Sequence, residues 1–319
     1  MLNLAIRGAF ALFLCTTGAA ALAEEAYVAN TGSGTITVID THTDQVVRTL
    51  PPQGTIGKKL QGMVVSPDGR VVLVVDAPAD GVAAVDSASG RVIKTIPSGK
   101  SPEGMQLSPD GKIAAACAEE SNVAALIDVE RLEQIKLIPL QGLNPEHCIF
   151  SPDQHWLYVS NENSSDIDVV DLAQGKSVAL IKGESHPRGM GFSPDGKLVY
   201  VANEASGEVH VIDTTTRQVV KKITTGLRCA GILVRPDGRF VYAANGGAGT
   251  ISVIDPATNT VVATIPVGQR PWNMALTRDG AKLYVANGRT DNVSVIDTAT
   301  NQVVQTVAVG KMPWGVAIR

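Results

Sequence analysis

A segment of about 42 residues recurs along most of the chain, and this repeat limits the folds that the chain can adopt. Its clearest marker is the tetrapeptide Ser-Pro-Asp-Gly at 66–69, and variants of it begin at residues 108, 151, 193, 235 and 277. Each unit holds short runs of β-branched residues separated by turn residues, as in 188–220, and this pattern predicts strands joined by tight turns. A constant period of about 40–45 residues with four strands is typical of a β-propeller.

The number of units follows from a second marker, an aspartate that ends the third strand of each copy. These residues are Asp40, Asp86, Asp128, Asp171, Asp213, Asp255 and Asp297. The chain beyond residue 23 opens with the second strand of a unit, at 27–30, and closes with a first strand, at 313–318. If these half-units pair, the ring has no exposed sheet edges. We therefore predict one all-β domain over 24–319, a seven-bladed propeller with four antiparallel strands per blade, closed by the C-terminal strand joining the N-terminal blade.

Residues 1–23 have the layout of a secretory signal peptide. Arg7 precedes an apolar run from Ala9 to Leu14, and small residues follow as far as Ala23, the order of segments found in such signals. The apolar run is too short to cross a bilayer comfortably. We expect an exported protein, cleaved near Ala23 and without a membrane span after cleavage; an uncleaved anchor is the alternative.

Charge and cysteine content exclude several other classes of function. The formal net charge of −4 does not favour a nucleic-acid partner. Beyond the leader the cysteines are Cys117, Cys148 and Cys229, an odd number that argues against a disulfide framework. No pair of them has metal-ligand spacing, and no metal site is expected. Cys117 and Cys148 fall within predicted strands, where we expect them to fill the core.

The loops that lead into the first strand of each unit differ in chemistry from copy to copy. Because the first strand of a propeller blade is innermost, we expect these loops to surround one mouth of the central channel. At one position of this loop the seven copies have Gln61, Glu103, Glu146, Arg188, Ala230, Trp272 and Trp314. The glycine that usually follows is replaced by His147 in one copy and by Asn273 in another.

Basic residues outnumber acids in these loops. The basic residues are Lys58, Lys59, Lys100, Arg188, Arg228, Arg270 and Lys311, and the acids are Glu103, Glu146 and Glu184. We therefore expect a positively charged funnel that attracts acidic ligands. Its arginines would grip a carboxylate or phosphate, and its tryptophans would stack on a flat ligand. The alternative is a solvated rim whose charges only keep this face soluble.

The units resemble YVTN β-propeller repeats. The matching residues are the Tyr-Val-Ala-Asn segments at 200–203 and 284–287, the six Ser-Pro-Asp-Gly-like turns and the seven aspartates, and the likeness covers nearly all of 26–319. With its leader, seven units and half-blade ends, the chain looks most like the exported propeller family associated with catabolism that depends on pyrroloquinoline quinone (PQQ).

The resemblance to this family implies a periplasmic protein that works near quinoprotein alcohol dehydrogenases, or near their electron-transfer or transport partners. It does not imply that the chain binds the quinone. No cofactor is therefore predicted, although PQQ or a related acidic ligand is a candidate for the mouth.

Two classes of function remain. We expect a non-catalytic binding or docking module for an acidic small molecule or a loop of a partner protein, without catalytic residues. Its candidate binding residues are Lys100, Glu103, Glu146, His147, His186, Arg188, Arg228, Arg270, Trp272, Asn273, Lys311 and Trp314. The alternative is an enzyme, since some seven-bladed propellers hydrolyse lactones with a Glu, His and Arg set at the channel. Here that set would be Glu103, Glu146, His147 and Arg188.

Overall fold

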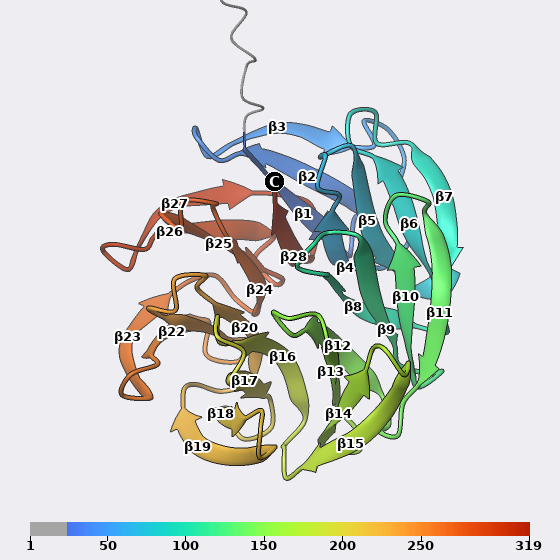
Figure 1. Cartoon of the computed structure of the whole chain (residues 1–319). Helices are drawn as coiled ribbons and strands as arrows, with labels where there is room; N and C mark the ends of the chain where they lie inside the picture. Colours follow the sequence, from blue (N-terminus) through green and yellow to red (C-terminus); the bar gives the residue numbers. More distant parts are fainter. Residues whose placement is uncertain (1–23) are drawn as a thin grey trace, which may run out of the picture.

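The computed structural model describes residues 24–319, which form a ring of seven four-stranded antiparallel sheets (Figure 1). The predicted fold is confirmed. The signal-peptide prediction for 1–23 lies outside the described residues. Within the described range, no helix is long and apolar enough to pass through a membrane.

We number the blades from the one that contains the N-terminal strand. Blade 1 consists of β28 (Pro313–Ile318), β1 (Glu25–Asn30), β2 (Thr35–Asp40) and β3 (Gln45–Leu50). Blade 2 consists of β4 (Leu60–Val65), β5 (Val71–Asp76), β6 (Gly81–Asp86) and β7 (Val92–Pro97), with a 3₁₀ turn, η1 (Ala77–Ala79). Blade 3 consists of β8 (Pro102–Leu107), β9 (Ile113–Ala118), β10 (Val123–Asp128) and β11 (Glu133–Pro139).

The remaining blades follow the same order from the inside outward. Blade 4 consists of β12 (Pro145–Phe150), β13 (Trp156–Asn161), β14 (Asp166–Asp171) and β15 (Lys176–Lys182). Blade 5 consists of β16 (Pro187–Phe192), β17 (Leu198–Asn203), β18 (Glu208–Asp213) and β19 (Gln218–Thr224). Blade 6 consists of β20 (Cys229–Val234), β21 (Val241–Asn245), β22 (Thr250–Asp255) and β23 (Thr260–Pro266). Blade 7 consists of β24 (Pro271–Leu276), β25 (Lys282–Asn287), β26 (Asn292–Asp297) and β27 (Gln302–Ala308).

The ring closes where the two ends of the described chain meet. Strand β28 pairs antiparallel with β1, so that Ile318 lies opposite Ala26. Just beyond this ladder, Glu25 and Arg319 exchange backbone hydrogen bonds of 2.8 and 2.9 Å. The closure prediction is therefore confirmed, and β28 covers the inner edge that β1 would otherwise expose.

The residues that recur from blade to blade hold turns and hairpins together. In the first Ser-Pro-Asp-Gly turn, the Ser66 hydroxyl donates to the Asp68 carboxylate at 2.6 Å. The Asp40 carboxylate accepts the backbone N–H of Thr43 at 2.8 Å, and the Asn30 amide donates across its hairpin to a threonine hydroxyl at 2.9 Å. These contacts recur in other blades. They have a structural role, as comparison among the copies predicts.

The core is divided into clusters that lie between neighbouring blades. Tyr200 of blade 5, for example, packs with Val241 of blade 6. Cys117 and Cys148 share the cluster between blades 3 and 4, which confirms that they fill core space. All three described cysteines are buried and free. Because each blade packs on its two neighbours only, the inner strands keep a fixed spacing around the axis.

Candidate functional site

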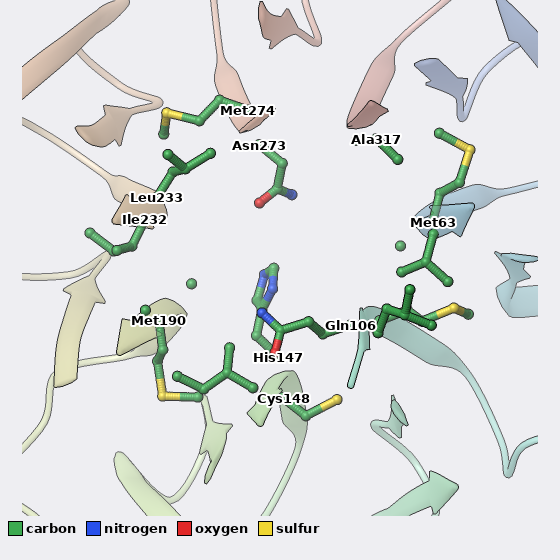
Figure 2. Close-up of a pocket in the computed structure, with 18 of the residues that line it drawn as sticks. Met63, Gln106, His147, Cys148, Met190, Ile232, Leu233, Asn273, Met274 and Ala317 are labelled. Carbon is green, nitrogen blue, oxygen red and sulfur yellow. The ribbon is translucent and has the colours of Figure 1, made fainter. Parts of the chain in front are cut away.

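The inner strands of all seven blades line a central cavity of about 670 Å³ (Figure 2). His147, Asn273 and Trp314 line it where the inner strands begin, and Pro109 and Pro152 line it where those strands end. The wall between these ends is largely apolar and includes Met63 and other methionines. Polar chemistry is therefore concentrated at the end where the first strands begin, which we call the mouth.

Four ring-bearing or planar groups stack across one side of the mouth. His147 and Trp314 stack with their centroids 5.6 Å apart and their planes within 10°. Trp314 and Trp272 stack at 6.5 Å, and the guanidinium carbon of Arg270 lies 3.9 Å from the Trp272 ring centroid. The tryptophans therefore pack on protein groups. Trp314 is buried and Trp272 stays partly exposed, so stacking on a ligand would be limited to Trp272.

Arg188 lies at the centre of the other side of the mouth and joins three blades. Its guanidinium is 2.8 Å from the Glu146 carboxylate, 3.2 Å from Glu103 and 3.1 Å from Glu162. It also contacts Glu204, and only 11% of its side chain is exposed. Ion pairs this deep are expensive to build unless every charge is matched.

The cluster extends beyond Arg188 on both sides. Glu204 also pairs with Arg270 at 3.0 Å and with Arg228 at 2.6 Å. On the other side, Glu103 shares a hydrogen bond with Glu119. We call this group the ion cluster. It comprises Glu103, Glu119, Glu146, Glu162, Glu204, Arg188, Arg228 and Arg270.

Three of its glutamates come from a position that the sequence analysis did not consider. Glu119, Glu162 and Glu204 each follow the last residue of a second strand. Their backbone N–H groups donate at 2.9–3.0 Å to a carbonyl in the loop before the inner strand, for example from Glu162 to Asn144. Asn144 accepts this bond in a left-handed conformation with φ of 62°. This backbone hydrogen bond places each glutamate beside the loop residues. A comparison of the repeats at the residue that follows the second strand would have identified the three glutamates.

The predicted positive funnel is wrong at the centre of the mouth. Five glutamates surround three arginines there, and each arginine is already paired with carboxylate. The exposed basic residues Lys100 and Lys311 stand apart at the rim. Glu184, another predicted loop acid, accepts a hydrogen bond from Asn203 inside blade 5 and does not join the cluster.

The other predicted residues are divided between the two sides of the mouth. His186 is exposed at the rim, with Nδ1 3.4 Å from a Glu162 oxygen. Asn273 lines the channel, and its amide donates to the Trp314 carbonyl at 3.5 Å. The structure thus brings together Glu103, Glu146, His147 and Arg188, and keeps Lys100 and Lys311 at the periphery.

Crowding of carboxylates separates their pKa values. Burial opposes ionisation of Glu103, but hydrogen bonds from Glu119 and Glu146 and the charge of Arg188 outweigh it and lower its pKa to about 2. Burial and the adjacent Glu103 raise the pKa of Glu119 to about 8. Burial and the charge of Glu103 also raise the pKa of Glu146 well above its usual value. At neutral pH the cluster therefore holds protons as well as charges.

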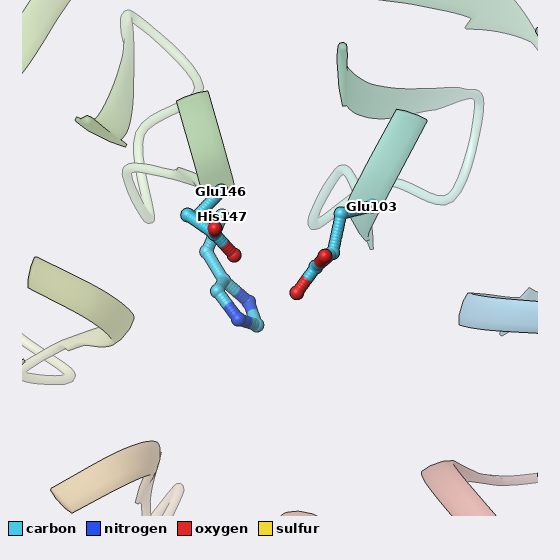
Figure 3. A group of neighbouring side chains, drawn as sticks. All are labelled: Glu103, Glu146 and His147. Atoms are coloured by element: carbon cyan, nitrogen blue, oxygen red, sulfur yellow. The ribbon is translucent and has the colours of Figure 1, made fainter. Parts of the chain in front are cut away.

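His147 completes the polar centre and faces two of these carboxyl groups (Figure 3). One oxygen each of Glu103 and Glu146 and a ring nitrogen of His147 all lie within 4.8 Å of one another. Burial lowers the pKa of His147 to about 4, although the Glu103 carboxylate acts in the opposite direction. A neutral imidazole beside carboxylates can accept a proton or ligate a metal ion.

The shift at Glu119 predicts a dependence of stability on pH. Its folded pKa of about 8 exceeds the usual 4.5, so the native state keeps a proton that the unfolded state loses as pH rises through this interval. Stability should fall over that range. Glu119→Gln mimics the protonated form, and we expect it to melt about 2–5 °C above the parent protein at pH 9.

Thermal unfolding followed by circular dichroism at pH 4.5, 7 and 9 measures this effect. The two proteins should melt together at pH 4.5 and separate as pH rises. Glu120→Gln, at the neighbouring exposed residue, is the matched control and should follow the parent protein throughout. A constant difference at all three pH values would contradict the assigned shift.

Comparison with known proteins places the chain among propellers. The profile of the YNCE-like beta-propeller family matches residues 21–318, and no curated protein matches the sequence. Among solved structures, hydrazine synthase of Kuenenia stuttgartiensis is 25% identical, with a TM-score of 0.77 over 86% of this chain and 92% of that chain.

Two further structures are similar over a larger share of the chain. A functionally unknown protein of Desulfotomaculum acetoxidans is 17% identical, with a TM-score of 0.79 over 92% of this chain and 98% of that chain. A candidate 6-phosphogluconolactonase of Bacteroides uniformis is 21% identical, with a TM-score of 0.76 over 93% of this chain and all of that chain. At these identities the likeness establishes the fold alone, because propellers carry many unrelated functions.

Proposed function

The chain belongs to the YNCE-like beta-propeller family, and we propose that it is a non-catalytic binding module whose ligand binds at the mouth. The observation that carries this proposal is the ion cluster itself. Five glutamates and three arginines are gathered at the end of a channel, where side chains from five blades meet.

The other blades indicate that the fold does not need these charges. At the positions of Glu103 and Glu146, blades 6 and 7 have Ala230 and Trp272. At the position of Glu162, the same blades have glycine. Blades can therefore close the mouth with small or apolar residues, whereas each buried ion costs several kcal/mol to desolvate. A role in binding accounts for the retention of the charged groups.

The charge pattern favours a neutral ligand that carries hydroxyl groups. Carboxylates accept hydrogen bonds from hydroxyls, and guanidinium groups donate to them. A polyanion would have to displace glutamates from Arg188 and Arg270. The buried centre thus does not suit PQQ or a similar acidic ligand. We propose a small polyol or sugar as the ligand class.

Glu162 provides the sharpest test of binding, because it belongs to the cluster and keeps 19% of its side chain exposed. We expect Glu162→Gln to weaken binding of a sugar or polyol at least tenfold by removing a charged acceptor. Calorimetric titration with glucose, xylose, glycerol, gluconate and PQQ measures this loss and ranks the ligand classes. Glu120→Gln is the control. Equal affinity of both variants would place the ligand elsewhere.

Hydrolysis of a lactone is the second candidate function. It is favoured by one observation, the meeting of Glu103, Glu146, His147 and Arg188 in a single group. A neutral His147 can accept a proton from water, and a carboxyl with a raised pKa can donate one to the leaving oxygen. Water would add to the carbonyl, the ring C–O bond would break, and a hydroxy acid would form.

A direct assay separates the two functions. Gluconolactone is added to the purified protein, and acid release is followed at constant pH. Turnover above the uncatalysed rate that is lost in Glu146→Gln and in His147→Ala would establish the enzyme. Binding without turnover would support the binding module.

We propose further that the protein is exported to the periplasm and works beside a quinoprotein dehydrogenase or its electron-transfer or transport partners. The support is the signal-like layout of 1–23 and the resemblance to exported propellers. Cell fractionation with N-terminal sequencing tests export. Co-purification from cells grown on an alcohol tests the partner, with a tagged Glu162→Gln variant beside the parent protein.

A further inference from the structure

We propose that Glu103, Glu146 and His147 form a binding site for a divalent transition-metal ion, an inference that deepens the proposed binding function and rests on it. The three side chains come from two neighbouring blades and point toward one another (Figure 3). Their donor atoms lie within 4.8 Å of one another. Two atoms that share a metal ion at bonds of about 2.0–2.2 Å lie at most about 4.4 Å apart, so a shift of no more than a few tenths of an ångström would bring the three donors onto one ion.

The backbone brings the two blades close at this point, as it does at the corresponding Gly62, Gly189 and Gly231. A Cβ atom at Gly104 would lie 2.4 Å from the Glu146 carbonyl oxygen and 3.2 Å from His147 Nδ1. Only glycine at 104 therefore lets β8 and β12 approach so that Glu103 faces His147. The convergence of donors depends on this close approach.

Arg188 contacts one oxygen of each carboxylate, and a bound ion would displace the protons that Glu103 and Glu146 share with Glu119 and Glu162. The Arg188 contact with Glu103 is through Oε1, and its contact with Glu146 is through Oε2. The second oxygen of each group makes no contact with this guanidinium. The cluster has five carboxyl groups and only three arginines, so a divalent ion would take the place of protons that the additional carboxyl groups hold.

A buried polar atom without a partner gives independent support. Gln61 occupies in β4 the position that Glu103 occupies in β8, and only 3% of it is exposed. Its Oε1 has no hydrogen-bond partner in the described part of the chain. Glu103, Glu146 and Arg188 occupy this position in blades 3 to 5 and contact one another, and we expect the Gln61 side chain of blade 2 to lie beside them. An amide oxygen is an acceptor, and burying one without a donor or a cation is costly.

The donor set indicates the class of ion. Two carboxylates and one imidazole suit Mn²⁺, Fe²⁺ or Zn²⁺ better than Ca²⁺ or Mg²⁺, which prefer oxygen donors throughout. His147 also lines the central cavity, so water or a ligand hydroxyl can reach the ion from the channel. Such an open position would let the ion bind the hydroxyl groups of the proposed ligand directly.

Titration of the purified, EDTA-treated protein with MnCl₂ tests the site, with calorimetry for affinity and electron paramagnetic resonance for bound ion. We expect one Mn²⁺ per chain, displaced by ZnCl₂. Glu146→Gln and His147→Gln should each weaken binding at least tenfold, and Glu120→Gln should not change it. Because an ion that binds only the folded state stabilises it, Mn²⁺ should also raise the melting temperature of the parent protein.

The outcomes separate this inference from the proposed function. Absence of stoichiometric Mn²⁺ and Zn²⁺ binding, or binding unchanged in both ligand variants, overturns the metal site even if a sugar binds. Metal binding without any sugar or polyol affinity supports the site and contradicts the proposed ligand. If the variants fail to fold, the parent protein decides the question: a melting temperature that Mn²⁺ does not raise overturns the site.

Discussion

Removal of residues 311–319 should severely destabilise the whole propeller. The truncation deletes β28, which pairs with β1 along its length and contributes buried Trp314 to the mouth. Loss of one large buried side chain alone costs about 3–5 kcal/mol. The lost ladder adds to this, and the total is comparable with the whole stability of a typical domain, about 5–15 kcal/mol. We expect the melting temperature to fall by at least about 10 °C.

Thermal and urea unfolding of the truncated and full chains measure the effect. Deletion of Arg319 alone is the matched control, because it removes only the two backbone bonds with Glu25 and leaves β28 in place. This control should remain cooperative. A truncated protein that melts within about two degrees of the full chain would show that β28 does not hold the ring closed.

Arg188→Met should be the most destabilising single substitution at the mouth. It leaves Glu103, Glu146 and Glu204 buried without their shared cation. Breaking a buried ion pair by removing one partner costs about 3–5 kcal/mol. Urea unfolding at pH 7.5 measures the loss. Arg228→Met is the control, since its side chain is 54% exposed and Glu204 keeps its other arginine partners.

The defect of Arg188→Met should depend on pH in a defined direction. Without the guanidinium, the buried carboxyl groups have folded pKa values above their unfolded ones. The native state then binds more protons, and stability falls as pH rises. The variant should therefore recover much of its stability between pH 8 and pH 5. The added substitution Glu103→Gln should rescue it at pH 7.5, because Glu103 is the carboxylate whose low pKa depends on the Arg188 charge. A defect that is the same at both pH values would indicate lost packing instead.

The fold could be predicted because its determinants are local and repeated. A turn such as 66–69 is held by its own side chains, so the same sequence motif forms the same turn in each copy. The half-unit ends also imply closure, since an incomplete blade leaves backbone groups unpaired. Neither inference needs a contact between distant residues to be known in advance.

The candidate site could be predicted only in part. The loop comparison identified Glu103, Glu146, His147 and Arg188, which the structure brings together. The charge was mispredicted because residues were counted within one set of loops and not together with their neighbours in space. Glu162 and Glu204 come from the ends of second strands, and their pairing with Arg188 depends on three-dimensional proximity. Whether a lysine of these loops stays at the rim or joins the ion cluster also depends on the exposure of its side chain.

The backbone bonds between Glu25 and Arg319 make the domain topologically a circle with a single cut. A short linker between these residues would join the ends with little rearrangement, and new termini could then be opened in the long connection at 51–59, which lies outside the strands. In such a circular permutant, blade 1 would be continuous in sequence. A peptide bond would then hold the ring closed where non-covalent strand pairing does so now.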